Sequence, residues 1–144
     1  MQSAMESNIV ILKLHNDEDL FEAIDWVVRK YDIRSGMILG GIGMLKSFEL
    51  GYFDPKGYKT KHFVEPCELV SMTGSIAYSK DDELNFLPHI HCTVADREHH
   101  VWGGHLHNGT VNVVNEITIL KLDGVKLNRI KNVNTGLMEF NIED

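Results

Sequence analysis

Three histidines in two short runs have the spacing of a metal-binding set. His89 and His91 are separated by one residue, and His105 follows in the run Gly-Gly-His-Leu. Residues two apart on a β-strand lie on the same face, so His89 and His91 would point in the same direction on a strand. Neutral imidazoles gathered on one surface typically bind Zn, Fe, Ni or Cu. The spacing therefore indicates one divalent metal ion, and we expect zinc, with Fe or Ni as the alternatives.

A β-hairpin would bring the third histidine to the other two. Pairing His91 with His105 would also place His89 opposite His107. The same register collects the apolar side chains of both strands on the opposite face, whereas a slip by one residue would mix the two faces. This register requires a loop with an odd number of residues, such as 97–99, or a bulge. The sequence therefore predicts a hairpin that carries the histidines on one face.

The number of ligands decides what such a site can do. Three protein ligands leave a coordination position open, as in catalytic zinc sites, whereas a fourth ligand from His107 would close the site. Glu68 and Glu116, in neighbouring expected strands, could orient a ligand histidine or accept a proton from bound water. The residue pattern leaves these roles open and assigns no catalytic residue. It also allows the histidines to be plain surface or subunit-interface residues.

The elements around the histidines indicate an α+β fold. Asn16 and the three acids that follow it are typical of a helix start, and apolar residues at helical spacing extend the predicted helix over 17–30. A turn is expected at 54–57. The predicted strands cover 9–14, 37–43, 46–52, 58–64, 68–76, 89–95, 100–107 and 111–122. We expect a single domain, residues 1–144, with a mainly antiparallel, partly barrel-like central sheet flanked by one principal helix.

Composition limits the kinds of partner that the protein can have. The net charge of −7 weighs against sequence-independent DNA binding, which needs a basic face. The cations Lys126, Arg129 and Lys131 are expected to form solvated surface. No run approaches the ~18 consecutive apolar residues of a membrane span, and residues 1–8 lack a secretory pattern, so we expect a cytoplasmic protein. The only two cysteines are expected to be buried, reduced thiols.

The histidine runs are part of a longer pattern that resembles a known family. Pro88 precedes the first run, Gly103 and Gly104 precede the third histidine, and Gly109 and Glu116 follow it. This combination resembles the PPC domain (DUF296, plants and prokaryotes conserved), in the stand-alone prokaryotic form that lacks an AT-hook. The resemblance covers nearly the whole chain and implies the same α+β fold that the strand and helix patterns predict.

The resemblance also implies a homotrimer with a metal site at the positions of His89, His91 and His105. In plants, PPC domains follow AT-hooks in DNA-binding proteins. This chain has no Arg-Gly-Arg-Pro hook, so direct DNA binding is not expected to carry over to it. His107 replaces an expected apolar residue, which keeps the ligand number open.

Three functions are compatible with these observations. The first is a metal-dependent protein that acts on a small molecule, as an enzyme or a sensor. The second is a trimeric module that binds another protein, for example in transcription. The third is a candidate DNA-binding regulator, which the acidic charge disfavours.

Overall fold

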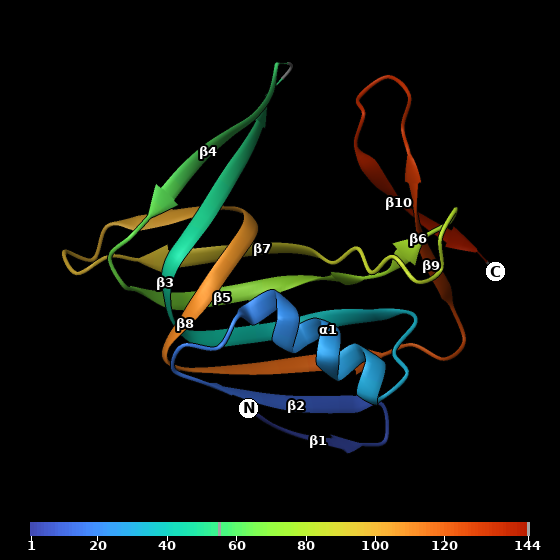
Figure 1. The fold of residues 1–144 in the computed structure, drawn as a ribbon, viewed down its shortest axis with the longest axis horizontal. Coiled ribbons are helices and arrows are strands. Elements are labelled where there is room, and N and C mark those ends of the chain that lie inside the picture. The colour runs from blue at the N-terminus through green and yellow to red at the C-terminus, as the bar shows by residue number, and fades with distance from the viewer. Residues whose placement is uncertain (55, 144) are drawn as a thin grey trace.

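One helix packs against a large antiparallel sheet, and a small second sheet extends from one end of it (Figure 1). The structure is a computed structural model that describes residues 1–54 and 56–143. The helix, α1 (Leu20–Lys30), connects the second strand to the third. The strands are β1 (Gln2–Glu6), β2 (Ile9–His15), β3 (Gly36–Asp54), β4 (Gly57–Phe63), β5 (Cys67–Ile76), β6 (Tyr78–Ser79), β7 (His89–Ala95), β8 (Val101–Lys121), β9 (Lys126–Lys131) and β10 (Met138–Glu143).

The large sheet closes partly on itself. Its strand order is β1-β2-β8-β7-β5-β3-β4, and β8 also pairs with β3. Strands β8, β7, β5 and β3 therefore form a ring of pairings, although the whole sheet is not a barrel. All pairings in this sheet are antiparallel. The predicted α+β fold with a mainly antiparallel, partly barrel-like sheet and one helix is confirmed.

The core lies between α1 and the inner face of the sheet. Along β2, fully buried Val10, Leu12 and Leu14 alternate with exposed residues, as expected for a strand with one solvated face. The helix contributes a buried stripe to the same core, and Trp26 lies off this stripe with an exposed side chain. No helix in the described ranges is both long enough and apolar enough to cross a membrane.

The helix begins later than the sequence predicts. Asp19, rather than Asn16, caps it: the Asp19 carboxylate accepts hydrogen bonds from Phe21 N at 2.8 Å and Glu22 N at 2.9 Å. Asp17 has a φ of 69° and cannot belong to the helix. Asn16 instead accepts a hydrogen bond from Val113 N at 3.1 Å, which ties the loop to β8.

Two pairs of strands that the sequence predicts as separate are each one long strand in the structure. The predicted strands 37–43 and 46–52 form β3, and 100–107 and 111–122 form most of β8. Register shifts between these two strands bend them without ending them. The strands β1, β6, β9 and β10 were not predicted. The expected turn at 54–57 includes Pro55, which lies outside the described residues.

Candidate metal site

The hairpin of β7 and β8 has the register that the histidine pattern predicts. His91 pairs with His105, Thr93 with Gly103, and Ala95 with Val101. Asp96 N donates a hydrogen bond to His100 O at 3.0 Å, which leaves residues 97–99 as a three-residue loop. His99 has a φ of 64°, as expected for the last residue of such a loop. The odd loop is confirmed, and the β7–β8 ladder contains no bulge.

Beyond His105 the two strands separate, so the expected pair of His89 and His107 does not form. The ladder between β7 and β8 ends at the pair of His91 and His105. There β8 bends toward β3, where Gly51 pairs with His105, while His89 pairs with Ser75 of β5. The prediction was wrong at this point because it took β8 as the partner of β7 alone.

The three predicted ligands converge on one point. One ring nitrogen from each of His89, His91 and His105 lies within 4.8 Å of the other two. The Nε2 atoms of His89 and His91 are 3.1 Å apart. A tetrahedral ion with bonds of 2.0–2.1 Å would hold two such nitrogens about 3.3 Å apart. The Nδ1 atom of His105 is buried and has no partner among the described residues. The donor set therefore fits a divalent ion.

The surroundings of His105 and His89 lower the pKa of both rings and so favour the neutral form that binds a metal. Burial lowers the pKa of His105 to about 4, and the nearby His89, His107, His91 and Arg129 act in the same direction. Burial, Arg129 and His91 also lower the pKa of His89. A neutral imidazole can donate its lone pair to a metal, whereas a protonated one cannot. On the opposite face of β7, burial raises the pKa of Cys92 to about 12, so no thiolate competes.

The low pKa of His105 predicts that the metal-free protein loses stability as the pH falls. The ordinary histidine pKa is near 6.5, so between pH 6.5 and 4 the unfolded chain binds a proton that the folded chain does not bind. Because the ring is only half-buried, we expect a loss of about 1 kcal/mol between pH 7 and pH 5 from this group. Urea unfolding in EDTA measures it, with His105→Gln as the control. An equal loss in both proteins would contradict the prediction.

The possible extra ligand His107 lies outside the converging group. Its ring is 4.6 Å from that of His105, and the ring of Tyr58 meets it edge-on at 4.9 Å. Its Nε2 atom is buried against Gly51, where a β-carbon would come within 2.3 Å of it. His107 therefore contacts His105 and Tyr58 but contributes no nitrogen to the converging group.

The two glutamates expected near the ligands lie elsewhere on the sheet. Glu68 pairs with Ala95, five residues along β5 from the partner of His91, which is about 17 Å at ~3.3 Å per residue. Glu116 pairs with Lys13 and Ile42, far along β8 from the hairpin. Their placement gives no support to the predicted hydrogen bonds with the ligand histidines.

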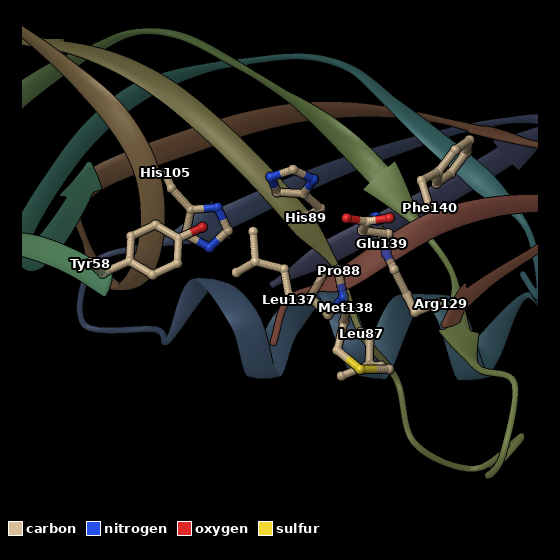
Figure 2. Close-up of a pocket in the computed structure, with 10 residues that line it drawn as sticks. All are labelled: Tyr58, Leu87, Pro88, His89, His105, Arg129, Leu137, Met138, Glu139 and Phe140. Atoms are coloured by element: carbon tan, nitrogen blue, oxygen red, sulfur yellow. The ribbon is translucent and has the colours of Figure 1, made fainter. Parts of the chain in front are cut away.

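A cavity that the sequence did not predict opens beside His89 and His105. Its volume is about 380 Å³. Figure 2 shows Tyr58 and His105 at one end and Arg129 and Phe140 at the other. The lining residues come from β4, the segment just before β7, β7 itself, β8 and the hairpin of β9 and β10: Tyr58, Leu87, Pro88, His89, His105, Arg129, Leu137, Met138, Glu139 and Phe140.

Arg129 corrects the expectation that the cations of residues 126–131 are all solvated. Its side chain is only 3% exposed, whereas Lys126 and Lys131 are exposed. The buried middle of β9, between two exposed lysines, follows from its position between β10 and β6. The sequence around Arg129 does not reveal this burial, because one of the two flanking strands, β6, pairs with it from about fifty residues earlier in the chain.

Known proteins resemble this chain in sequence. A sequence model of the Plants and Prokaryotes Conserved (PCC) domain matches residues 1–123. Two relatives from Synechococcus strains JA-2-3B'a(2-13) and JA-3-3Ab, each named bifunctional protein GlmU, are 28% and 27% identical over 134 and 135 residues. The matches cover 92% of this chain and 20% of each relative, so this chain spans about a fifth of their length.

Solved structures resemble it over nearly its whole length. A candidate DNA-binding protein from Bacteroides thetaiotaomicron has a TM-score of 0.87 and 27% identity, covering 97% of this chain and 96% of that one. A metal-containing protein from Archaeoglobus fulgidus has a TM-score of 0.82 and 27% identity, covering 98% and 99%. A plant- and prokaryote-conserved protein from Pyrococcus horikoshii has a TM-score of 0.80 and 28% identity, covering 96% and 94%.

Proposed function

Because the chain belongs to the Plants and Prokaryotes Conserved (PCC) domain family, we propose that it is a metal-binding member that holds one divalent ion on His89, His91 and His105. The convergence of their three ring nitrogens within 4.8 Å carries this proposal. A 27% identical protein of the same fold, from Archaeoglobus fulgidus, is named as metal-containing, which supports it. We propose zinc, because three imidazoles at this spacing suit tetrahedral coordination, with Fe or Ni as the alternatives.

The role proposed for the ion is to bind a small molecule at a position that the protein leaves open. Three ligands leave at least one position free, and His89 and His105 also line the 380 Å³ cavity. A metal in such a site supplies Lewis acidity or lowers the pKa of a bound water. The residues around the cavity would bind and orient the molecule. Turnover would be a further step, which a screen of hydrolytic and lyase reactions with the metal-loaded protein would detect.

Metal content tests the proposal directly. The untagged wild-type protein is expected to contain close to one equivalent of metal by mass spectrometry, and the variant His89→Ala/His91→Ala/His105→Ala is expected to contain almost none. His62→Ala, which removes an exposed histidine from β4, serves as the matched control and should keep the metal. A wild-type protein that takes up no metal even after reconstitution would overturn the proposed function.

A second candidate function, a homotrimeric module that binds another protein, is favoured by the outer face of the sheet. Ile11, Ile42 and Val70 are each more than half exposed, and the register of β2, β8 and β3 places Ile11 and Ile42 on the sheet face away from the buried side chains of β2. Apolar side chains on a sheet face are commonly covered by a second chain. We propose that copies of this chain cover them as a homotrimer. If the wild-type protein takes up no metal, this candidate becomes the leading one.

The cysteines indicate the compartment of the protein, and the net charge bears on the third candidate function, a DNA-binding regulator. Cys67 and Cys92 are both buried and free, which suits a reducing compartment, and we propose that the protein acts in the cytoplasm. The net charge of −7 gives no support to direct DNA binding, although the similar structure from Bacteroides thetaiotaomicron carries that name.

A further inference from the structure

Arg129 is a buried cation that lacks an anionic partner. Its side chain is 3% exposed, and its Nη2 atom donates a hydrogen bond to Ser75 Oγ at 2.6 Å. Its guanidinium carbon lies 5.2 Å from the centre of the Phe140 ring. Within residues 1–54 and 56–143, no carboxylate comes within 4.0 Å of its nitrogens. A guanidinium has five N–H donors and stays charged, so its burial without a counter-ion is costly.

This cation shares the cavity wall with the histidines. Arg129, His89 and His105 all line the same 380 Å³ space (Figure 2). Ser75, which accepts the hydrogen bond from Arg129, is paired with His89 across β5 and β7, so their side chains lie on one face. Most of the remaining lining is apolar: Leu87, Pro88, Leu137, Met138 and Phe140. The cavity thus offers one fixed positive charge and a hydrocarbon surface next to the metal ligands.

Glu139 is the obvious internal partner for Arg129, but its carboxylate is engaged elsewhere. Glu139 lines the same cavity and is exposed. Its Oε1 atom accepts a hydrogen bond from Asn132 Nδ2 at 2.7 Å. Glu139 and Arg129 are too far apart to form an ion pair, so the guanidinium remains able to pair with a ligand. A negative charge on Glu139 would weaken the binding of an anion, which gives an independent test.

We propose that this cavity binds a small carboxylate with an apolar body, whose carboxylate group pairs with Arg129. The planar guanidinium fork matches a carboxylate in a two-bond geometry. A phosphate dianion would need more positive charge than one arginine supplies, and it would leave the apolar wall unused. The volume is near the lower end of pockets that hold small molecules, which favours a compact ligand. A second polar group of the ligand would face the metal position; this part rests on the proposed function, whereas the contact with Arg129 does not.

Titration of the metal-free protein with matched probes tests the proposal. In EDTA, followed by calorimetry or NMR shifts, hexanoate is expected to bind at least about tenfold more tightly than hexanamide, because both partners of its hydrogen bonds with Arg129 are charged, whereas hexanamide offers a neutral acceptor. Arg129→Gln should abolish this preference. The control Lys131→Gln, which removes an exposed cation of the same strand outside the cavity, should keep it. Glu139→Gln, an exposed substitution, should tighten hexanoate binding severalfold.

Equal binding of hexanoate and hexanamide to the wild-type protein, or no binding of either, would overturn the proposal even if Arg129→Gln fails to fold. Tighter binding of inorganic phosphate than of hexanoate would overturn the assignment of a carboxylate. Because the titration contains no metal, a negative result in it does not contradict metal binding. Conversely, a protein that takes up no metal can still prefer hexanoate, so the two proposals can fail independently.

Discussion

The variant His105→Ala is expected to lose almost all of the stabilisation that zinc gives to the wild-type protein. Zinc at about one hundred times its dissociation constant should stabilise the wild-type fold by about 2.7 kcal/mol. For a domain of this size, that corresponds to a rise in Tm of roughly 5–10 °C. His105 supplies one of only three converging nitrogens, so a two-ligand remnant should bind too weakly to shift the Tm. Thermal unfolding with EDTA and with zinc measures the difference for each protein.

The comparison between the two conditions separates metal binding from packing. His105 is half-buried and lies at the point where β8 leaves β7 and pairs with Gly51 of β3, so its loss also weakens the metal-free fold. Subtracting the Tm in EDTA from the Tm in zinc removes this packing cost. His62→Ala, exposed on β4, should keep the full rise. A rise in His105→Ala equal to that of the wild type would contradict its role as a ligand.

The effect of His107→Ala in the same assay distinguishes a metal site with three protein ligands, which leaves a coordination position open, from one closed by a fourth ligand. His107 contacts the ring of His105 but lies outside the group of converging nitrogens. Its removal should loosen the orientation of His105 and weaken zinc binding by about tenfold, the low end of the range typical of residues that support a ligand. A loss as complete as that of His105→Ala would show that His107 is a fourth ligand. The site would then be closed, and the proposed small-molecule position would not exist.

The histidine hairpin was predictable because its information is local. Residues 89–107 contain both strands and the loop, and their alternation allows only one register that keeps the apolar side chains together. The structure has that register from Ala95–Val101 to His91–His105. The prediction failed one step further on, because the bend of β8 toward β3 depends on strand contacts that lie more than fifty residues away in sequence.

The cavity and Arg129 could not be predicted from the sequence for the same reason. Arg129 stands between ordinary surface lysines, and its burial results from pairing with β10 on one side and β6 on the other. Ser75, its hydrogen-bond partner, is 54 residues away. The predicted helix start was wrong for a more local reason. Asn16, Asp17 and Asp19 are all good cap residues, and the positive φ of Asp17 is what excludes the first two.

Gly43→Ala is expected to be among the most destabilising single substitutions in the protein, by roughly 3–5 kcal/mol. Gly43 has a φ of 138°, a conformation that alanine adopts only under strain. A β-carbon there would lie 2.0 Å from the Val114 carbonyl oxygen and 2.5 Å from the Asn115 Oδ1 atom. Asn115 is fully buried, and this Oδ1 atom accepts the hydrogen bond of Met44 N at 3.1 Å. The substitution would therefore add a clash, backbone strain and a broken buried hydrogen bond at one place.

Gly43 lies where the long strand β3 changes direction between its pairings with two parts of β8. Before Gly43, β3 pairs with the part of β8 that packs under α1; after it, β3 continues to Gly51, beside His105. The register shift between Gly43 and Leu45 lets β3 make this change of direction without ending.

Gly40 in the same strand is the matched control for Gly43→Ala, because a β-carbon there meets nothing within 4 Å and its φ is not positive. Gly40→Ala should change the free energy of unfolding by less than about 1 kcal/mol. Urea unfolding of both variants in EDTA measures the contrast, and similar values for the two would mean that the bend at Gly43 does not need a glycine.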